Sequence, residues 1–327
     1  MTSPFFWIVF SLITGALGAM TIKRYGAGLG LTDHPNERSS HRMPVPRGGG
    51  IGISAAFALS GLLLGVPYAF LIPACLISLV SLWDDRSDIA PRIRLIVQLI
   101  LSLAVALWIF STRGWPSSGL FLVIFSTLFI AGTANCYNFM DGINGIAATT
   151  GVVGFGLLFF YGNQGGGDPR FVTLSLVLSA ACLGFLPFNC PVAGVFMGDT
   201  GSILLGFAFA GITLVFSNGF NGFMVMTGFL FPFYADEAIT MVIRLTKKEN
   251  LFMPHRKHLY QILVNERGID HWKIACAFGL VQLGAGLFFM MLKPLGLAAL
   301  FIGHAILFSA MAILNIVVRK KSDTPSP

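Results

Sequence analysis

Glycine-flanked carboxylates are the first candidates for chemistry in this sequence. The stretch Phe196-Met197-Gly198-Asp199-Thr200-Gly201-Ser202 precedes an apolar run from Ile203 to Val215, so Asp199 lies at or just before a helix N-terminus. Free backbone N–H groups and the positive end of the helix dipole favour anions there. We therefore expect Asp199 to hold a metal ion against a bound phosphate. The alternative is an ordinary aspartate cap on a buried helix.

A pair of adjacent carboxylates, Asp84 and Asp85, ends another apolar run. If a helix extends that far, the two side chains point roughly 100° apart, so we expect separate roles for them. One carboxylate would contact a metal ion, and the other an acceptor or an arginine. Carboxylates at the end of a membrane span are costly to desolvate without a partner, which disfavours the alternative of a solvated loop.

Polar residues recur at every third position where a further apolar run ends, at Asn135, Asn138, Asp141 and Asn144. On a helix, neighbouring members of this series lie close together. Polar side chains so near a membrane pair with one another or line a polar cavity. Asparagines alone often bind helices together, but an aspartate followed by a glycine favours a ligand site.

Basic residues gather in two loops. The first loop holds Arg38, Arg42 and Arg47, followed by Gly48-Gly49-Gly50 with its backbone N–H groups at the start of a span. Guanidinium groups suit phosphate, although a basic loop beside a membrane can simply bind anionic lipid. The second loop holds Pro254-His255-Arg256-Lys257-His258, which we expect to contact anionic oxygen; a solvated loop is the alternative. Its histidine spacing does not match an HExxH zinc site.

The elements that position these residues follow from composition. The chain has 327 residues, of which 55% are hydrophobic and only 11% charged, and its mean hydropathy is +0.79. Long apolar runs of this kind indicate transmembrane helices in a lipid bilayer. The net charge of +7 would suit nucleic acid, but the basic residues form no single soluble patch, so we expect no nucleic-acid partner. The five cysteines show no paired spacing and are expected to be small core residues.

The apolar runs predict an all-α integral membrane protein of about eleven transmembrane helices. Their expected limits are 4–20, 49–66, 68–82, 93–110, 119–135, 142–161, 171–187, 202–216, 221–243, 273–292 and 295–318. Residues 1–318 are expected to form one polytopic domain, followed by a short polar tail at 319–327. Lys23-Arg24 follows the first run and no positive residue precedes it, which places the N-terminus in the periplasm and the C-terminus in the cytoplasm.

This orientation puts all 21 Lys and Arg residues inside except Arg113, Arg170 and Lys293, as the positive-inside rule requires. Of the 14 acidic residues only Asp168 falls outside. The candidate chemistry therefore lies on the cytoplasmic face. Asp236-Glu237 falls within the ninth run and needs partners there, whereas the isolated His304 is expected to be a hydrogen-bonded structural residue.

Together and in this order, four motifs resemble those of the polyprenyl-phosphate N-acetylhexosamine-1-phosphate transferase family. They are Asp84-Asp85, Asn135-x-x-Asn138-x-x-Asp141-Gly142, Gly198-Asp199-x-Gly201-Ser202 and His255-Arg256-x-His258. The loop from Asp33-His34-Pro35 through Arg47-Gly48-Gly49 resembles the branch that initiates O-antigen and related glycans. The resemblance implies transfer of a sugar 1-phosphate from a UDP-linked N-acetyl amino sugar to undecaprenyl phosphate at the bacterial inner membrane. UMP would be released, and Mg²⁺, or Mn²⁺ in its place, would assist.

The same resemblance implies a role for each motif residue. Asp199 and Asp84 would be metal ligands, and Asp84 would also activate or orient the lipid phosphate, with Asp85 in support. The nucleotide side would comprise Asn135, Asn138, Asp141 and Asn144, with Phe196 stacked on uracil and Arg47 on phosphate. His255, Arg256 and His258 would hold the pyrophosphate.

Two departures from the family pattern refine the expectation. Many relatives carry a second aspartate three residues after the one at position 141, and this chain has Asn144 there. The loop Pro254-His255-Arg256-Lys257-His258 is not a run of three histidines, which argues against the peptidoglycan enzyme and for the glycan-initiating branch. The donor sugar, the final glycan, the division of roles between Asp84 and Asp85, and the oligomeric state stay open, with a homodimer one candidate.

Two other classes of protein compete with a transferase. A carboxylate-dependent membrane transporter predicts charged groups near the bilayer midplane and internally repeated halves. Here the acids cluster at one edge, with Asp236 the one exception, and the sequence shows no repeat. A non-catalytic scaffold predicts that Asp84, Asp85 and Asp199 tolerate alanine.

Overall fold

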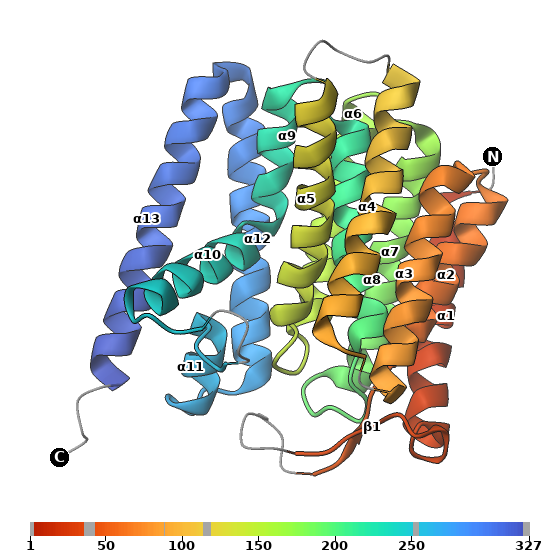
Figure 1. Cartoon of the computed structure of the whole chain (residues 1–327), viewed down its shortest axis with the longest axis vertical. Coiled ribbons are helices and arrows are strands. Elements are labelled where there is room, and N and C mark those ends of the chain that lie inside the picture. The colour runs from red at the N-terminus through yellow and green to blue at the C-terminus, as the bar shows by residue number, and fades with distance from the viewer. Residues whose placement is uncertain (1–2, 36–42, 88, 114–118, 251–254, 323–327) are drawn as a thin grey trace.

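The computed structural model describes residues 3–35, 43–87, 89–113, 119–250 and 255–322, and these form a helical bundle with one short ribbon (Figure 1). The α-helices are α1 Pro4–Tyr25, α2 Ile51–Leu63, α3 Tyr68–Ser87, α4 Pro91–Arg113, α5 Gly119–Phe139, α6 Ile146–Gln164, α7 Pro169–Asn189, α8 Asp199–Phe216, α9 Phe220–Thr227, α10 Phe231–Thr246, α11 Leu259–Asn265, α12 His271–Leu292 and α13 Leu297–Ser322. Three 3₁₀ turns, at Ala27–Leu29, Gly228–Leu230 and Lys293–Leu295, join some of them. Strands β1 (Thr32–Asp33) and β2 (Val45–Pro46) pair antiparallel.

The prediction of an all-α multi-pass membrane protein is confirmed. Within the described residues, nine helices are long and apolar enough to cross a membrane, namely α1, α3 to α8, α12 with its 3₁₀ extension, and α13. Helix α1 begins at the upper end of the bundle and α13 ends at the lower end, so the two ends of the chain lie at opposite ends of the bundle (Figure 1).

Two of the predicted spans differ from single full-length helices. The span expected at 49–66 is α2, with 13 residues. The span expected at 221–243 is broken into α9 and the oblique α10 by the turn at Gly228–Leu230. Pro232 lacks the backbone N–H that a continuous helix would need, so it stands in the first turn of α10. A Cβ on Gly228 would come within 2.0 Å of the Phe289 ring, so only glycine lets α12 pack this closely on the break.

Helix α8 forms the centre of the bundle. Sixteen of its 18 residues are buried, as expected of a helix that is apolar on every side. Small residues bring its neighbours close: a Cβ on Gly206 would lie 2.6 Å from the Thr133 carbonyl oxygen of α5, and one on Gly211 would meet the Phe70 ring of α3. This packing presents the N-terminus of α8, with Asp199, at the middle of the lower end.

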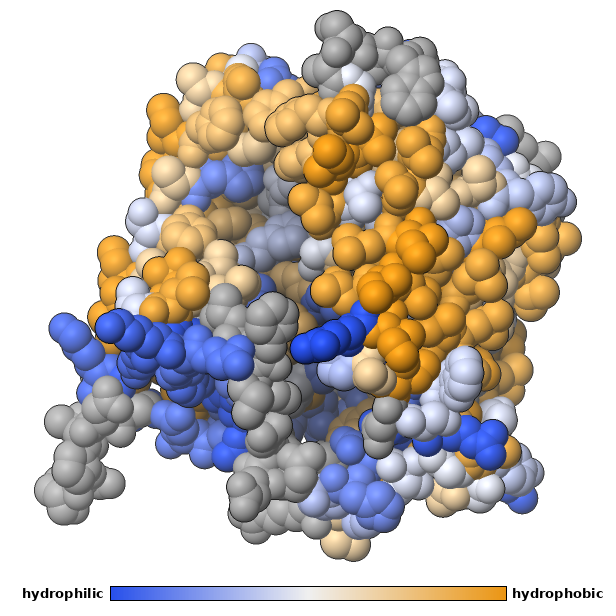
Figure 2. Space-filling model, in the orientation of Figure 1, coloured by the Kyte–Doolittle hydropathy of each residue, from blue (hydrophilic) through white to orange (hydrophobic). Residues whose placement is uncertain are grey.

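The surface divides into two zones along the axis of the bundle. Hydrophobic residues cover the upper and right-hand parts of Figure 2, and hydrophilic residues gather at the lower end. Large apolar side chains face outward on the outermost helices; on α13, for example, Ile302 and Ile306 are 60% and 57% exposed. Such exposure is costly in water and natural in lipid. The lower end, where β1, β2 and α11 lie, is therefore the polar face that carries the candidate site (Figure 1).

Candidate functional site

The loop before α8 is held against the glycine triplet that precedes α2. The backbone N–H groups of Gly49 and Gly50 donate to the carbonyl oxygens of Phe196 and Met197 at 2.9 and 2.8 Å. Gly198 has φ +74°, and a Cβ there would lie 2.5 Å from the Asp85 carboxylate. Two of the N–H groups that the sequence predicted to be open to a phosphate are therefore occupied, because they position the Asp199 loop.

Asp85 reaches from the end of α3 to the start of α8. Its Oδ1 accepts a hydrogen bond from the Asp199 backbone N–H at 3.0 Å. Its Oδ2 accepts from the Thr200 N–H at 3.1 Å and from the Thr200 hydroxyl at 2.7 Å. The carboxylate thus accepts hydrogen bonds from otherwise unpaired donors at the N-terminus of α8. Its negative charge also interacts favourably with the positive end of the helix dipole. Asp85 lines the site, but its oxygens are occupied by the protein.

Asp84 has different partners from Asp85, as the helical geometry predicts. Its Oδ1 accepts from the Ile89 backbone N–H at 2.6 Å, and its Oδ2 accepts from Arg94 Nη1 at 2.6 Å. The same Nη1 donates to Asp199 Oδ2 at 2.9 Å. Arg94 therefore joins two carboxylates that are 115 residues apart. The available sequence signal was a guanidinium at the second residue of the span expected at 93–110, a position that favours a polar partner.

Asn138 completes the setting of Asp199. Its amide nitrogen donates to Asp199 Oδ1 at 2.8 Å and to the Ser202 hydroxyl at 2.9 Å. Asn135, one turn earlier, instead bonds Gln98 of α4 and the Ala131 carbonyl oxygen. Asn135 thus pairs helices, the alternative reading for such asparagines.

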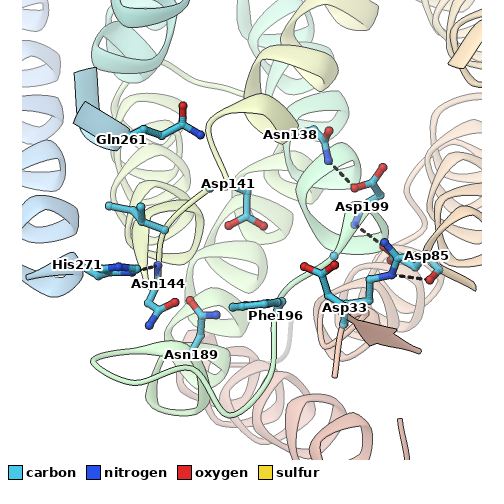
Figure 3. A pocket seen from close by; sticks show the side chains of 14 residues that line it. Asp33, Asp85, Asn138, Asp141, Asn144, Asn189, Phe196, Asp199, Gln261 and His271 are labelled. Atoms are coloured by element: carbon cyan, nitrogen blue, oxygen red, sulfur yellow. Dashed lines mark hydrogen bonds between the residues drawn. The ribbon is translucent and has the colours of Figure 1, made fainter. Parts of the chain in front are cut away.

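Asp85, Asn138 and Asp199 line a cavity of about 270 Å³ at the lower end of the bundle (Figure 3), referred to below as the pocket. The predicted site residues Asp84 and Asn135 lie outside its described lining. Its described lining comprises Asp33, Arg47, Asp85, Asn138, Asp141, Gly142, Ile143, Asn144, Asn189, Phe196, Gly198, Asp199, Gln261 and His271. The sequence analysis did not single out Asn189, Gln261 or His271 as site residues. The structure brings Arg47, Asp85, Asn138, Asp141, Asn144, Phe196 and Asp199 into one lining, as predicted.

Asp141 differs from the other pocket carboxylates in having no hydrogen-bond partner for its side chain among the described residues. It lies in the turn between α5 and α6 and faces the middle of the pocket (Figure 3). Burial, followed by the negative charges of Asp199 and Asp85, raises the pKa of Asp141 well above its ordinary value. A carboxylate left without a partner among like charges is suited to a cation.

The far side of the pocket is built from amides and an imidazole. The Asn144 backbone N–H donates to His271 Nδ1 at 3.1 Å. Asn189 accepts from the Gly145 N–H at 2.6 Å and donates to the Val195 carbonyl oxygen at 2.9 Å, which ties the α5–α6 turn to the Phe196 loop. The Phe196 ring lies at the pocket wall between Asn189 and Asp33 in Figure 3. This side offers an aromatic face with neutral hydrogen-bonding groups around it.

The loop with His255, Arg256 and His258 lies outside the described lining of the pocket. The buried His258 ring contacts Glu237 of α10, with Nε2 3.5 Å from the carboxylate, and lies 4.9 Å from the His255 ring. Burial, followed by nearby positive charge, lowers the pKa of His255 to about 4. Burial and then the neighbouring His255 lower that of His258 to about 3. Both rings are thus neutral at pH 7 in this arrangement, and their role toward pyrophosphate stays a prediction.

Helix α11 supplies the partner that Asp236 needs inside its span. Its Oδ1 accepts from the Leu259 backbone N–H at 2.9 Å, so the carboxylate caps this short helix. From α11, Tyr260 donates to the Phe139 carbonyl oxygen at 2.9 Å, and Gln261 reaches the pocket. Asp236, one of the two acids within the ninth run, therefore helps to hold the helix that brings Gln261 to the pocket. His304, as expected, bonds within its own helix, with Nδ1 2.9 Å from the Leu300 carbonyl oxygen.

The donor set of the pocket suits a divalent cation of the magnesium type. Four carboxylates, Asp33, Asp85, Asp141 and Asp199, line it, and Arg47 is the one Lys or Arg in its described lining. Mg²⁺ takes oxygen ligands and is commonly held by one or two carboxylates together with phosphate oxygens. No cluster of three His, Cys, Asp or Glu with metal-ligand geometry occurs among the described residues. A site here would therefore be shared with a substrate.

The fold and the pocket define a class: a multi-pass membrane protein with an acidic pocket at one end of its helical bundle. Residues 67–217, which run from before α3 through α8, match the model of glycosyl transferase family 4. Over 246 residues the chain is 32% identical to the undecaprenyl-phosphate alpha-N-acetylglucosaminyl 1-phosphate transferase of Thermotoga maritima, covering 74% of this chain and 75% of that protein. The chain belongs to glycosyl transferase family 4.

Two further relatives cover still more of the chain. The probable undecaprenyl-phosphate N-acetylglucosaminyl 1-phosphate transferase of Bacillus subtilis is 27% identical over 287 residues, 80% of this chain and 77% of that protein. The phospho-N-acetylmuramoyl-pentapeptide-transferase of Desulfotalea psychrophila is 25% identical over 321 residues, 85% of this chain and 88% of that protein. The resemblance stated from the four motifs is thereby confirmed at the level of the family.

Proposed function

We propose that this protein transfers a sugar 1-phosphate from a UDP-linked N-acetyl amino sugar to undecaprenyl phosphate, releasing UMP, as the first membrane step of a cell-envelope glycan. The names of the relatives support the polyprenyl-phosphate acceptor and the N-acetylglucosamine type of donor. The departure from a triple-histidine loop supports the glycan-initiating branch that builds O-antigen and related polysaccharides.

The observation that carries this proposal is the charge of the pocket. A UDP-sugar and a lipid phosphate are both anionic, and four carboxylates facing them against one lining arginine would repel both. A divalent cation removes this conflict, so we assign Mg²⁺ to the pocket, with Mn²⁺ able to replace it. Asp199 and Asp141, which line the pocket, would hold it, while Asp84, which lies outside the described lining, would act through Arg94.

The reaction needs no proton from the protein. An oxygen of the lipid phosphate attacks the phosphorus that carries the sugar, and the bond from that phosphorus to the bridging oxygen breaks. UMP leaves with the bridging oxygen, and the sugar becomes joined to the lipid through a new diphosphate. The bound cation would neutralise charge that builds on the transferred phosphoryl group. Arg94 would hold Asp199 in place, and Arg47 would balance charge on the diphosphate.

The opposite side of the pocket would read the nucleotide. The Phe196 face is suited to stack on uracil, since base–aromatic stacking contributes about 1–3 kcal/mol per base. Asn144, Asn189 and His271 surround this ring with neutral hydrogen-bonding groups. Arg47 lines the pocket, and Lys23 and Arg24 lie in the last turn of α1 at the same end of the bundle, whereas Arg38 and Arg42 fall outside the described residues. We therefore place the pocket on the cytoplasmic face of a bacterial inner membrane.

A substrate panel tests the proposal. Membranes that contain the protein would be supplied with undecaprenyl phosphate, Mg²⁺ and one UDP-sugar at a time, and UMP release would be measured. We expect release with at least one UDP-N-acetyl amino sugar, and its loss on chelation and in Asp199→Ala. Full activity of Asp199→Ala would contradict the proposed role of that carboxylate. The absence of UMP release with every donor would contradict the proposed function.

A further inference from the structure

A second cavity of about 270 Å³ lies at the opposite end of the bundle from the pocket. It is formed where α4 and α8 end and α7 begins, at the top of Figure 1. Its lining includes Trp108, Thr112, Arg113, Asp168, Arg170 and Phe171. None of these residues takes part in the proposed transfer, so the cavity needs a separate explanation.

The cavity collects most of the positive charge at this end of the molecule. The sequence places three Lys or Arg residues there, Arg113, Arg170 and Lys293, and the first two line the cavity although 57 residues separate them. Arg170 forms an ion pair with Asp168, with Nη2 2.6 Å from Oδ2. Arg113 has no acidic partner among the described residues. Two guanidinium groups and one carboxylate therefore leave the lining with one net positive charge.

Arg113 is held in place by the end of α8. Its Nη2 donates to the Val215 carbonyl oxygen at 2.5 Å and its Nη1 to the Ser217 carbonyl oxygen at 2.9 Å. A guanidinium group has five N–H donors, so these two bonds orient the fork and leave donors over. A fixed, partly satisfied guanidinium with an uncompensated charge is suited to a phosphate oxygen.

The cavity has an apolar floor beneath this charge. The rings of Trp108 and Phe171 stack, with centroids 6.2 Å apart. Trp108 lies just over one turn before Arg113 on α4, as tryptophans do at a membrane interface. Toward the N-terminus of the same helix, and so farther from this end of the bundle, large apolar side chains are exposed at Ile100, Leu103 and Leu107. A ligand with a negatively charged head group and hydrocarbon chains would match these features. Its charge would balance the positive lining, and its hydrocarbon would contact the two rings and the exposed apolar face of α4.

We infer that this cavity binds the phosphodiester headgroup of an anionic phospholipid from the membrane leaflet at that end. Such a headgroup carries one negative charge, which balances the net charge of the lining. Its acyl chains would lie along the exposed apolar face of α4. This inference does not depend on the transferase activity.

Lipid retention tests it. The full-length protein would be delipidated in detergent and given phosphatidylglycerol or phosphatidylethanolamine, and retained lipid would be measured by native mass spectrometry. We expect Arg113→Gln to lower phosphatidylglycerol retention about tenfold, the effect of losing one charge-assisted contact, with phosphatidylethanolamine unchanged. Lys293→Gln is the matched control: it removes the third cation at the same end, one that sits over the Tyr161 ring, and should change neither. UMP release should be the same in all three proteins.

A measurement on the wild type covers the case in which Arg113→Gln fails to fold. In hydrogen–deuterium exchange, phosphatidylglycerol should slow exchange across 162–171 more than phosphatidylethanolamine does, and inorganic phosphate should not reproduce the effect. Equal protection by the two lipids, or equal losses in Arg113→Gln and Lys293→Gln, would overturn the inference. Protection by inorganic phosphate alone would show a free-phosphate site and overturn the lipid assignment.

Discussion

The two sides of the pocket hold their carboxylates in opposite ways. On the α3–α8 side, each oxygen of Asp84, Asp85 and Asp199 accepts a hydrogen bond from the protein. On the α5–α6 side, Asp141 has no such bond within the described chain. The protein thus fixes the carboxylates on the first side, including Asp199, which lines the pocket as a proposed cation ligand. Asp141, on the other side, would offer the cation oxygens that accept no hydrogen bond from the described chain. Substitutions should separate the two.

The largest effect is expected where the scaffold meets the pocket. Asp199→Asn would keep one acceptor oxygen but would turn an amide toward Arg94, which would then lose one of its two carboxylates. We expect UMP release to fall by about 10²–10³-fold or more, the usual cost of removing an electrostatic group from a phosphoryl-transfer site. Glu266→Gln, an exposed acid at the same end, is the matched control and should keep full activity.

Asp141→Asn and Asp85→Ala give the sharpest contrast between the two sides. The first removes a charge but no hydrogen bond, so we expect about a 10²-fold loss of activity with an unchanged or higher thermal midpoint. The second leaves three donors at the start of α8 without an acceptor, which should cost about 2–4 kcal/mol of stability. Thermal unfolding of both variants in one detergent checks this. Equal destabilisation by the two substitutions would erase the distinction.

A smaller effect is expected on the aromatic wall. Phe196→Leu keeps bulk but removes the stacking face, so the KM for the UDP-sugar should rise about tenfold, in line with the energy of one base–aromatic stack. The value of kcat should change less, because the ring contacts the nucleotide before and during the reaction. Initial rates at varied donor concentration separate the two constants. A fall in kcat at constant KM would contradict a stacking role.

The smallest effect concerns the loop behind the pocket. The pKa of His258 is about 3, below the ordinary 6.5, so the unfolded chain binds a proton there that the folded chain does not. Its contribution to stability is complete above pH 6.5 and is lost as the pH falls toward 3. His258→Gln should therefore flatten the fall in thermal midpoint between pH 7.5 and 5. An unchanged pH profile would argue that the ring is already charged against Glu237.

The comparison also separates what the sequence can predict from what it cannot. Apolar runs suffice for the order and approximate limits of the nine long helices among the described residues, because a bilayer imposes length and hydropathy on each span. They overstate the number of full-length spans, since those expected at 49–66 and 221–243 are a short helix and a broken one. Asp85, Asp141 and Asp199 could be assigned to one site because each follows or precedes a span at the same end. Pro232 is a local signal for the break before α10, but the Phe289 ring that leaves room only for glycine at 228 comes from another helix, and no local pattern contains that contact.

The sequence analysis missed the site residues that come from other helices and contact the predicted ones. Arg94 joins Asp84 to Asp199 only after α4 packs beside α3 and α8. His271 and Asn189 reach the pocket through bonds to the α5–α6 turn. Their residue types carry no signal at those positions. Conversely, Asn135 shares the spacing of Asn138 but pairs with Gln98 instead, because one turn along α5 changes the neighbouring helix.

The chemical form of the lipid product tests the central claim most directly. Purified protein would be given undecaprenyl phosphate, Mg²⁺ and the active UDP-sugar, and both products would be identified by mass spectrometry. We predict UMP together with a lipid that carries its sugar through a diphosphate, formed only when the cation is present. UDP together with a lipid that carries its sugar through a single phosphate would mean that the sugar alone is transferred, and would contradict the account.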